Sequence, residues 1–130
     1  MNKALIAIAA LTLTGCMQLN LEREHGYQVQ SVNGQAVLAG TRITLTLDKD
    51  GRIYGNAGCN HFFGTYHLDD KALTFSQLGS TRRLCAEPVM AQEYAFLERL
   101  SRNVRWSNSH DQLKLMSKTR EPVVLIRDKH

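Results

Sequence analysis

The chain has 130 residues, of which 43% are hydrophobic and 22% are charged, and its formal net charge is +4. This length suits one domain with its own hydrophobic core. The basic residues are spread along the chain, without the runs of about five or six like charges that are typical of nucleic-acid-binding tails. We therefore interpret the positive charge as part of a solvated surface, weakly attracted to anionic lipid or cell-wall polymers.

Residues 1–15 are organised like a bacterial signal peptide. Lys3 gives a basic start, and residues 4–11 form an apolar run. That run is shorter than the roughly 20 residues of a membrane-spanning helix and is typical of a signal-peptide core. It ends in Leu13-Thr14-Gly15-Cys16, which resembles the lipobox of bacterial lipoproteins. The resemblance implies that residues 1–15 are removed and that Cys16 carries the lipid.

A lipid on Cys16 would anchor the protein to a membrane of the cell envelope. Residues 16–26 are then the lipidated cysteine and a short polar tether. Because Met17 rather than Asp follows the cysteine, the resemblance implies sorting to the outer membrane, facing the periplasm, where nucleic acid is not a partner. The alternative is an ordinary secretory signal with a cysteine nearby by chance.

The remaining cysteines, Cys59 and Cys85, form an even pair in an oxidising compartment. Such a pair predicts a disulfide. For a loop of this length, the loop-entropy account gives a stabilisation of about 3.5 kcal/mol.

Alternation of apolar and polar residues predicts short strands along the chain after the tether. Ile43, Leu45 and Leu47 alternate with threonines, and residues 48–51 have the composition of a turn, so 42–57 is expected to form a hairpin. Further strands are predicted at 27–32, 62–68, 73–78, 80–85, 104–107, 113–116 and 123–127.

One segment has helical periodicity instead. Pro88 suits the first turn of a helix, and Phe96, Leu97 and Leu100 form an apolar stripe, so we predict a helix over 88–102. The fold class is therefore mainly β with one helix (α+β): a small antiparallel sheet curled into a β-barrel, with the helix covering or plugging one end. The aromatic residues expected to fill the barrel are Phe62, Phe63, Tyr66 and Trp106.

A glycine-rich motif lies in the middle of the predicted barrel. Its residues, in chain order, are Gly51, Gly55, Gly58, Cys59, Asn60, Gly64, Tyr66, Thr81, Arg82 and Cys85. This order resembles the META domain family, which includes the bacterial heat-shock lipoprotein HslJ, and we place the domain at 27–128. The resemblance implies a non-catalytic lipoprotein that acts in stress tolerance, against heat and novobiocin-type antibiotics. It implies no enzymatic activity and no cofactor.

The chemistry of the motif favours a structural role. Gly55, Gly58 and Gly64 permit positive φ or a close backbone approach, Asn60 suits a tight turn, and Tyr66 supplies buried area. We interpret these residues as a corner of the barrel held by the disulfide.

Two chemical alternatives were weighed for the same stretch. Zinc could be held by Cys59, His61, His67 and Cys85, but their spacing matches no structural zinc motif. Cys59 could act as a nucleophile beside His61, but a disulfide would prevent that.

Arg82 and Arg83 are the candidate contacts for an anion or a partner's carboxylate; the simpler interpretation pairs one of them with Glu87. The expected partners are an envelope protein or an amphiphilic ligand, bound through the loops at 55–60, 78–86 and 108–112. The alternative function is an inhibitor of a cell-wall hydrolase such as lysozyme.

Overall fold

The computed structural model describes residues 26–70, 72–102 and 104–128. The predicted signal peptide and the tether up to residue 25 lie outside the described residues, as do 71, 103 and 129–130.

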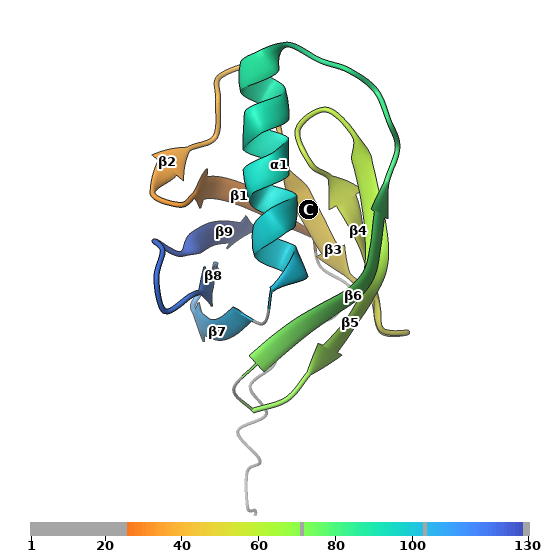
Figure 1. Cartoon of the computed structure of the whole chain (residues 1–130). Helices are drawn as coiled ribbons and strands as arrows, with labels where there is room; N and C mark the ends of the chain where they lie inside the picture. Colours follow the sequence, from red (N-terminus) through yellow and green to blue (C-terminus); the bar gives the residue numbers. More distant parts are fainter. Residues whose placement is uncertain (1–25, 71, 103, 129–130) are drawn as a thin grey trace, which may run out of the picture.

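The described residues form one antiparallel barrel and one helix (Figure 1). The helix, α1, spans Glu87–Ser101. The strands are β1 (Gly26–Val32), β2 (Gln35–Ala36), β3 (Thr44–Leu47), β4 (Arg52–Asn56), β5 (His61–Leu68), β6 (Ala72–Ser80), β7 (Val104–Ser109), β8 (Gln112–Met116) and β9 (Val123–Arg127).

Pairing of the first and last strands closes the barrel. The strands follow the order β2-β1-β3-β4-β5-β6-β7-β8-β9, and β1 also pairs with β9. Eight strands thus form the closed wall, and the short β2 pairs only with the last two residues of β1. The predicted fold class is confirmed.

The period-2 pattern explains which residues enter the barrel. In β3, Leu45 and Leu47 are buried while the threonines between them are half-buried. The interior is filled by such apolar side chains, including Phe62, Phe75 and Trp106. Phe63 is the exception among the aromatic residues expected inside. It is 54% exposed, because it follows the buried Phe62 directly and successive strand residues face opposite sides.

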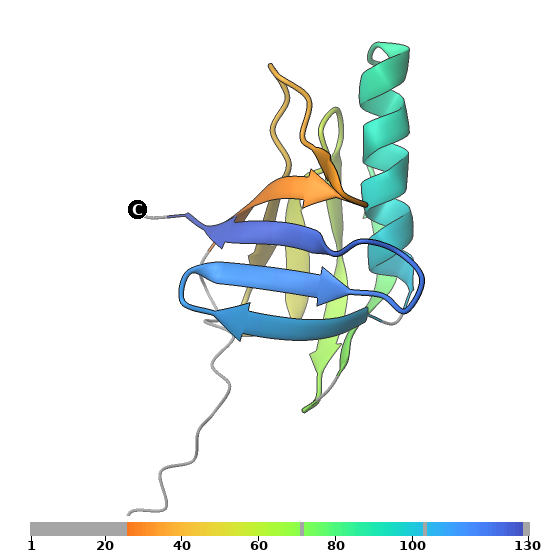
Figure 2. The same ribbon diagram turned by 90° about the vertical axis from the view of Figure 1, so that its left-hand side faces the viewer.

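Helix α1 lies across one end of the barrel (Figure 2). Phe96 and Leu100 are fully buried. The ring of Phe96 meets that of Phe62 edge to face, with 5.5 Å between the ring centroids. The predicted position of the helix over one barrel end is therefore correct, with both bounds one residue later than observed.

The strand predicted at 80–85 is wrong. Strand β6 ends at Ser80, and residues 81–86 form an irregular loop. The backbone N–H of Arg83 donates to Asn60 Oδ1 at 2.6 Å, and the carbonyl of Arg83 accepts from Asn60 Nδ2 at 3.1 Å. The backbone of Arg83 is therefore bound to a side chain and not to a neighbouring strand.

The wall of the barrel depends on a close backbone approach at Gly55. A Cβ atom placed there would lie 2.1 Å from the carbonyl oxygen of Thr44 and 3.1 Å from the ring of Phe62. The first contact is with the main chain, so no side-chain movement could relieve it. Only glycine fits at this position.

We expect Gly55→Ala to lower the free energy of unfolding by about 3 kcal/mol, because β3 and β4 would have to move apart. Gly40→Ala is the matched control. No atom lies within 4 Å of a Cβ at Gly40, although its φ of +80° would impose strain of about 1–2 kcal/mol. Urea unfolding measures both variants. Equal losses would contradict the close-approach argument.

Candidate functional site

The carboxylate of Glu93 on α1 is buried and accepts three hydrogen bonds. Glu93 is 5% exposed. Its Oε1 accepts hydrogen bonds from the backbone N–H of Cys59 at 3.2 Å and of Asn60 at 2.6 Å. Its Oε2 accepts one from Asn60 Nδ2 at 2.8 Å. Glu93 therefore ties the helix to the turn that connects β4 and β5.

Asn60 extends this network to loop 81–86. Its Oδ1 accepts hydrogen bonds from the N–H of Arg83 at 2.6 Å and from Thr81 Oγ1 at 3.0 Å. Its Nδ2 also donates to the carbonyl of Arg83 at 3.1 Å. Asn60 is 3% exposed, and it joins the turn, the loop and the helix in one polar junction.

A disulfide closes the same junction. Cys59 and Cys85 are bonded, with their Cα atoms 6.1 Å apart and a sequence separation of 26. The predicted pairing is confirmed, although both cysteines are half-buried rather than in the core. Neither sulfur is available as a metal ligand or nucleophile, and His61 and His67 are exposed on β5. No cluster of three metal-ligating side chains occurs in the described ranges.

A second buried charge holds the other half of α1. Arg99 is 3% exposed and donates to Asn33 Oδ1 and to the carbonyl of Glu121, both at 2.7 Å. It also donates to the carbonyl of Leu115 at 3.1 Å. Burial lowers the pKa of Arg99, and the nearby charge of Arg120 lowers it further. The helix is thus fixed at two points across the barrel end.

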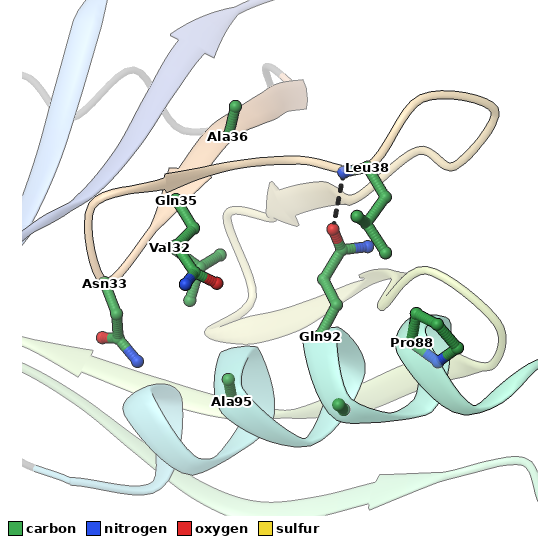
Figure 3. A pocket seen from close by; sticks show the side chains of 9 residues that line it. Val32, Asn33, Gln35, Ala36, Leu38, Pro88, Gln92 and Ala95 are labelled. Carbon is green, nitrogen blue, oxygen red and sulfur yellow. Dashed lines mark hydrogen bonds between the residues drawn. The ribbon is translucent and has the colours of Figure 1, made fainter.

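A groove runs between α1 and the segment that follows β1 (Figure 3). Its volume is about 270 Å³, and its walls are Val32, Asn33, Gln35, Ala36, Leu38, Pro88, Ala91, Gln92 and Ala95. Gln92 spans it by accepting a hydrogen bond from the N–H of Leu38 at 2.7 Å and donating one to Thr41 Oγ1 at 3.1 Å. The groove is therefore bridged by bonds internal to the domain.

Two other motif residues, Gly64 and Tyr66, lie in β5 of the barrel wall. Gly64 sits at a bulge between β5 and β6, where a Cβ would come within 2.9 Å of the carbonyl oxygen of Ser76. Tyr66 donates its hydroxyl hydrogen to the carbonyl of Asp48. The hydrogen bond from the backbone N–H of Arg52 is the main cause that lowers the pKa of Asp48. Gly58, with a φ of +118°, belongs to the turn at the junction.

The predicted contact residues Arg82 and Arg83 both lie in loop 81–86 and are exposed. Within the described residues, no ion pair links either of them to Glu87. The structure thus leaves both cations facing solvent.

The sequence patterns described above give no role to Glu93 or to Arg99. One signal could have identified Glu93. It is three residues before Phe96 and seven before Leu100, on the apolar stripe itself. A charged residue that faces the core from such a stripe needs partners there, because burial of an unpaired charge is costly.

The fold and the junction define a class of protein. It is a small, filled β-barrel whose buried polar residues hold a helix over one end. In the described part of the chain, no helix has both the length and the hydropathy needed to cross a membrane.

Comparisons with known proteins agree with this class. The model of the META domain matches residues 18–130, so the chain belongs to the META domain family. A protein from Burkholderia xenovorans, solved by NMR, is 26% identical with a TM-score of 0.66, covering 83% of this chain and 84% of that one. Another NMR structure has 24% identity and a TM-score of 0.67, covering 80% and 89%, and supports the fold alone. The comparison with curated proteins found no match.

Cys59→Ser should lower the free energy of unfolding by about 3.5 kcal/mol, because the 26-residue separation is no longer bridged in the unfolded chain. Thermal unfolding would show this as a fall in Tm of more than about 10 °C. Reduced wild type is the control and should melt like the variant. An unchanged Tm after complete reduction would rule out this role for the disulfide.

Glu93→Ala should destabilise the domain by about 3 kcal/mol, because three donors, two of them buried, lose their acceptor. Hydrogen exchange at the amides of Cys59 and Asn60 should accelerate. Glu98→Ala is the control. It removes only the ion pair with Arg102 on the same helix, worth about 0.5 kcal/mol. If the two variants were equally stable, the junction would not hold the helix.

Proposed function

We propose that this member of the META domain family is a non-catalytic lipoprotein of the bacterial cell envelope. Its lipid is carried by Cys16, and its barrel acts as a binding module in stress tolerance. The lipobox-like sequence before Cys16 supports the anchor. The membership of the META domain family supports the role in tolerance of heat and of novobiocin-type antibiotics.

The observation that carries the binding-module proposal is the internal use of the buried polar residues. The hydrogen bonds of the buried polar side chains are made to the domain's own backbone and side chains, as seen for Glu93, Asn60 and Arg99. The apolar core residues fill the barrel. An enzyme or a carrier of small molecules needs a cleft with available chemical groups. This arrangement instead favours recognition through exposed loops.

Loop 81–86 is the best candidate for that recognition among the loops named from the sequence. The turn at 57–60 is bonded into the junction. The β7–β8 connection is a tight turn, with Ser109 paired directly to Gln112. Loop 81–86, in contrast, presents exposed side chains at each position from 81 to 84.

The test uses a host strain that lacks the protein, complemented with wild type or with Cys16→Ala. We expect wild type to stay in the membrane fraction and to restore growth under heat and novobiocin. Cys16→Ala should be released from membranes and should restore growth poorly. Intact mass of the extracted wild type should show acyl groups on a chain that begins at Cys16.

Equal growth of the deleted and the complemented strains would overturn the stress role. Retention of Cys16→Ala in membranes would overturn the lipid anchor. The purified domain should also leave lysozyme activity unchanged. Inhibition of lysozyme would favour the hydrolase-inhibitor function instead.

A further inference from the structure

Loop 81–86 combines two exposed cations with an exposed aliphatic side chain. Leu84 is 92% exposed, more than any other large hydrophobic residue in the described part of the chain, and Tyr94 on α1 follows at 71%. Arg82 and Arg83 precede Leu84 directly and are exposed as well. Exposure of a leucine to this degree, beside two arginines, gives the loop an apolar tip with a basic border.

The loop is held in place at alternate positions. Thr81 bonds to His61, with its N–H donating to the carbonyl at 3.0 Å and its Oγ1 accepting from the N–H at 3.1 Å. Arg83 is bound through its backbone to Asn60, and Cys85 is fixed by the disulfide. The exposed side chains are thus presented by a fixed backbone, so little conformational entropy of the backbone is lost when they make contacts.

Leu84 and Tyr94 belong to the same edge of the domain. The N–H of Cys85, next to Leu84, donates to Met90 Sδ at 3.4 Å. Met90 and Tyr94 line one shallow hollow on α1, together with Leu97. Figure 1 shows the loop running from the end of β6 to the start of α1.

The charge of this edge complements an anionic surface. The carboxylate of Glu93 is buried and hydrogen-bonded within the junction, and that of Glu98 forms an ion pair with Arg102. Glu87, at the start of α1, is an exposed acid next to the loop. Guanidinium groups bind phosphate oxygens well, leucine enters the acyl boundary of a bilayer, and tyrosine favours its interface.

The proposed anchor would bring such a surface within reach. From Cys16 to Gly26 the chain can extend at most about 35 Å, and a domain of about 100 residues has a radius of gyration of about 13 Å. The tether is therefore long enough for any face of the barrel to meet the membrane, and the orientation must come from the domain's own surface.

We propose that loop 81–86, with Tyr94, docks on an anionic lipid membrane. Arg82 and Arg83 contact lipid phosphates while Leu84 inserts between headgroups, and this docking turns the helix-covered end of the barrel toward the bilayer. The proposal deepens the proposed function and depends on its envelope location, but not on lipidation of Cys16.

The test measures vesicle binding by the chain that begins at Met17, which contains the whole closed barrel and its core and lacks the lipid site. Vesicles of phosphatidylcholine are compared with vesicles that also contain phosphatidylglycerol, by sedimentation at low and at high salt. We expect binding to the anionic vesicles alone, weakened by salt. Each of Arg82→Gln and Arg83→Gln should weaken binding about five-fold, and Leu84→Ala about ten-fold.

Two controls separate docking by the loop from general attraction. Arg105→Gln removes an exposed cation on β7. Arg105 pairs with Ala72 at the start of β6, whereas the loop follows the other end of that strand, so this variant should leave binding unchanged. Glu87→Gln should strengthen it. The three loop variants change exposed side chains, and unchanged thermal unfolding would verify their fold.

The proposal is overturned if wild type does not bind the anionic vesicles, or if Arg105→Gln weakens binding as much as Arg82→Gln. It is also overturned if the loop variants lose binding to an acidic envelope protein while vesicle binding is unaffected. The chain used for vesicle binding lacks Cys16. A failure to bind vesicles would therefore not bear on the lipid anchor, which the membrane fractionation of Cys16→Ala tests separately.

Discussion

The buried hydrogen bonds between Glu93 and Asn60 are the constraint on which the arrangement depends. Burial of a carboxylate is costly unless donors surround it, and here three donors do. Asn60 must therefore stay in its turn, and α1 must stay over the barrel end. In the described residues, no buried side-chain polar atom lacks a partner, which indicates that this cost is met throughout the domain.

The barrel could be predicted because its strands follow simple patterns. Alternation, clearest in residues 43–47, together with apolar runs and turn composition, located the wall-forming strands. The even pair of cysteines, in a chain expected to be exported, predicted the disulfide. Strand β2 escaped prediction because it has only two residues. The segment after Ser80 was wrongly predicted to be a strand. Its backbone bonds to a side chain, and the alternation of apolar and polar residues gives no sign of such bonds.

The candidate site was less predictable for a related reason. Sequence patterns assign charged residues to solvent, so the burial of Glu93 and Arg99 was not foreseen. Their roles depend on contacts with residues 16 to 66 positions away in the chain, which local periodicity does not encode. Arg82 and Arg83 were predicted as candidate contacts, but the exposure of Leu84 beside them required the fold.

The position of β1 has a mechanical consequence. It is bonded on both sides, to β3 and to β9, and the carbonyl of its first residue, Gly26, accepts a hydrogen bond from the N–H of Asp128 at 2.8 Å. A pulling force on the chain ahead of Gly26 would enter the domain along this strand. It would load both ladders in shear, so that many bonds share the tension instead of opening one after another. The strand that receives the load is thus also the strand that closes the barrel.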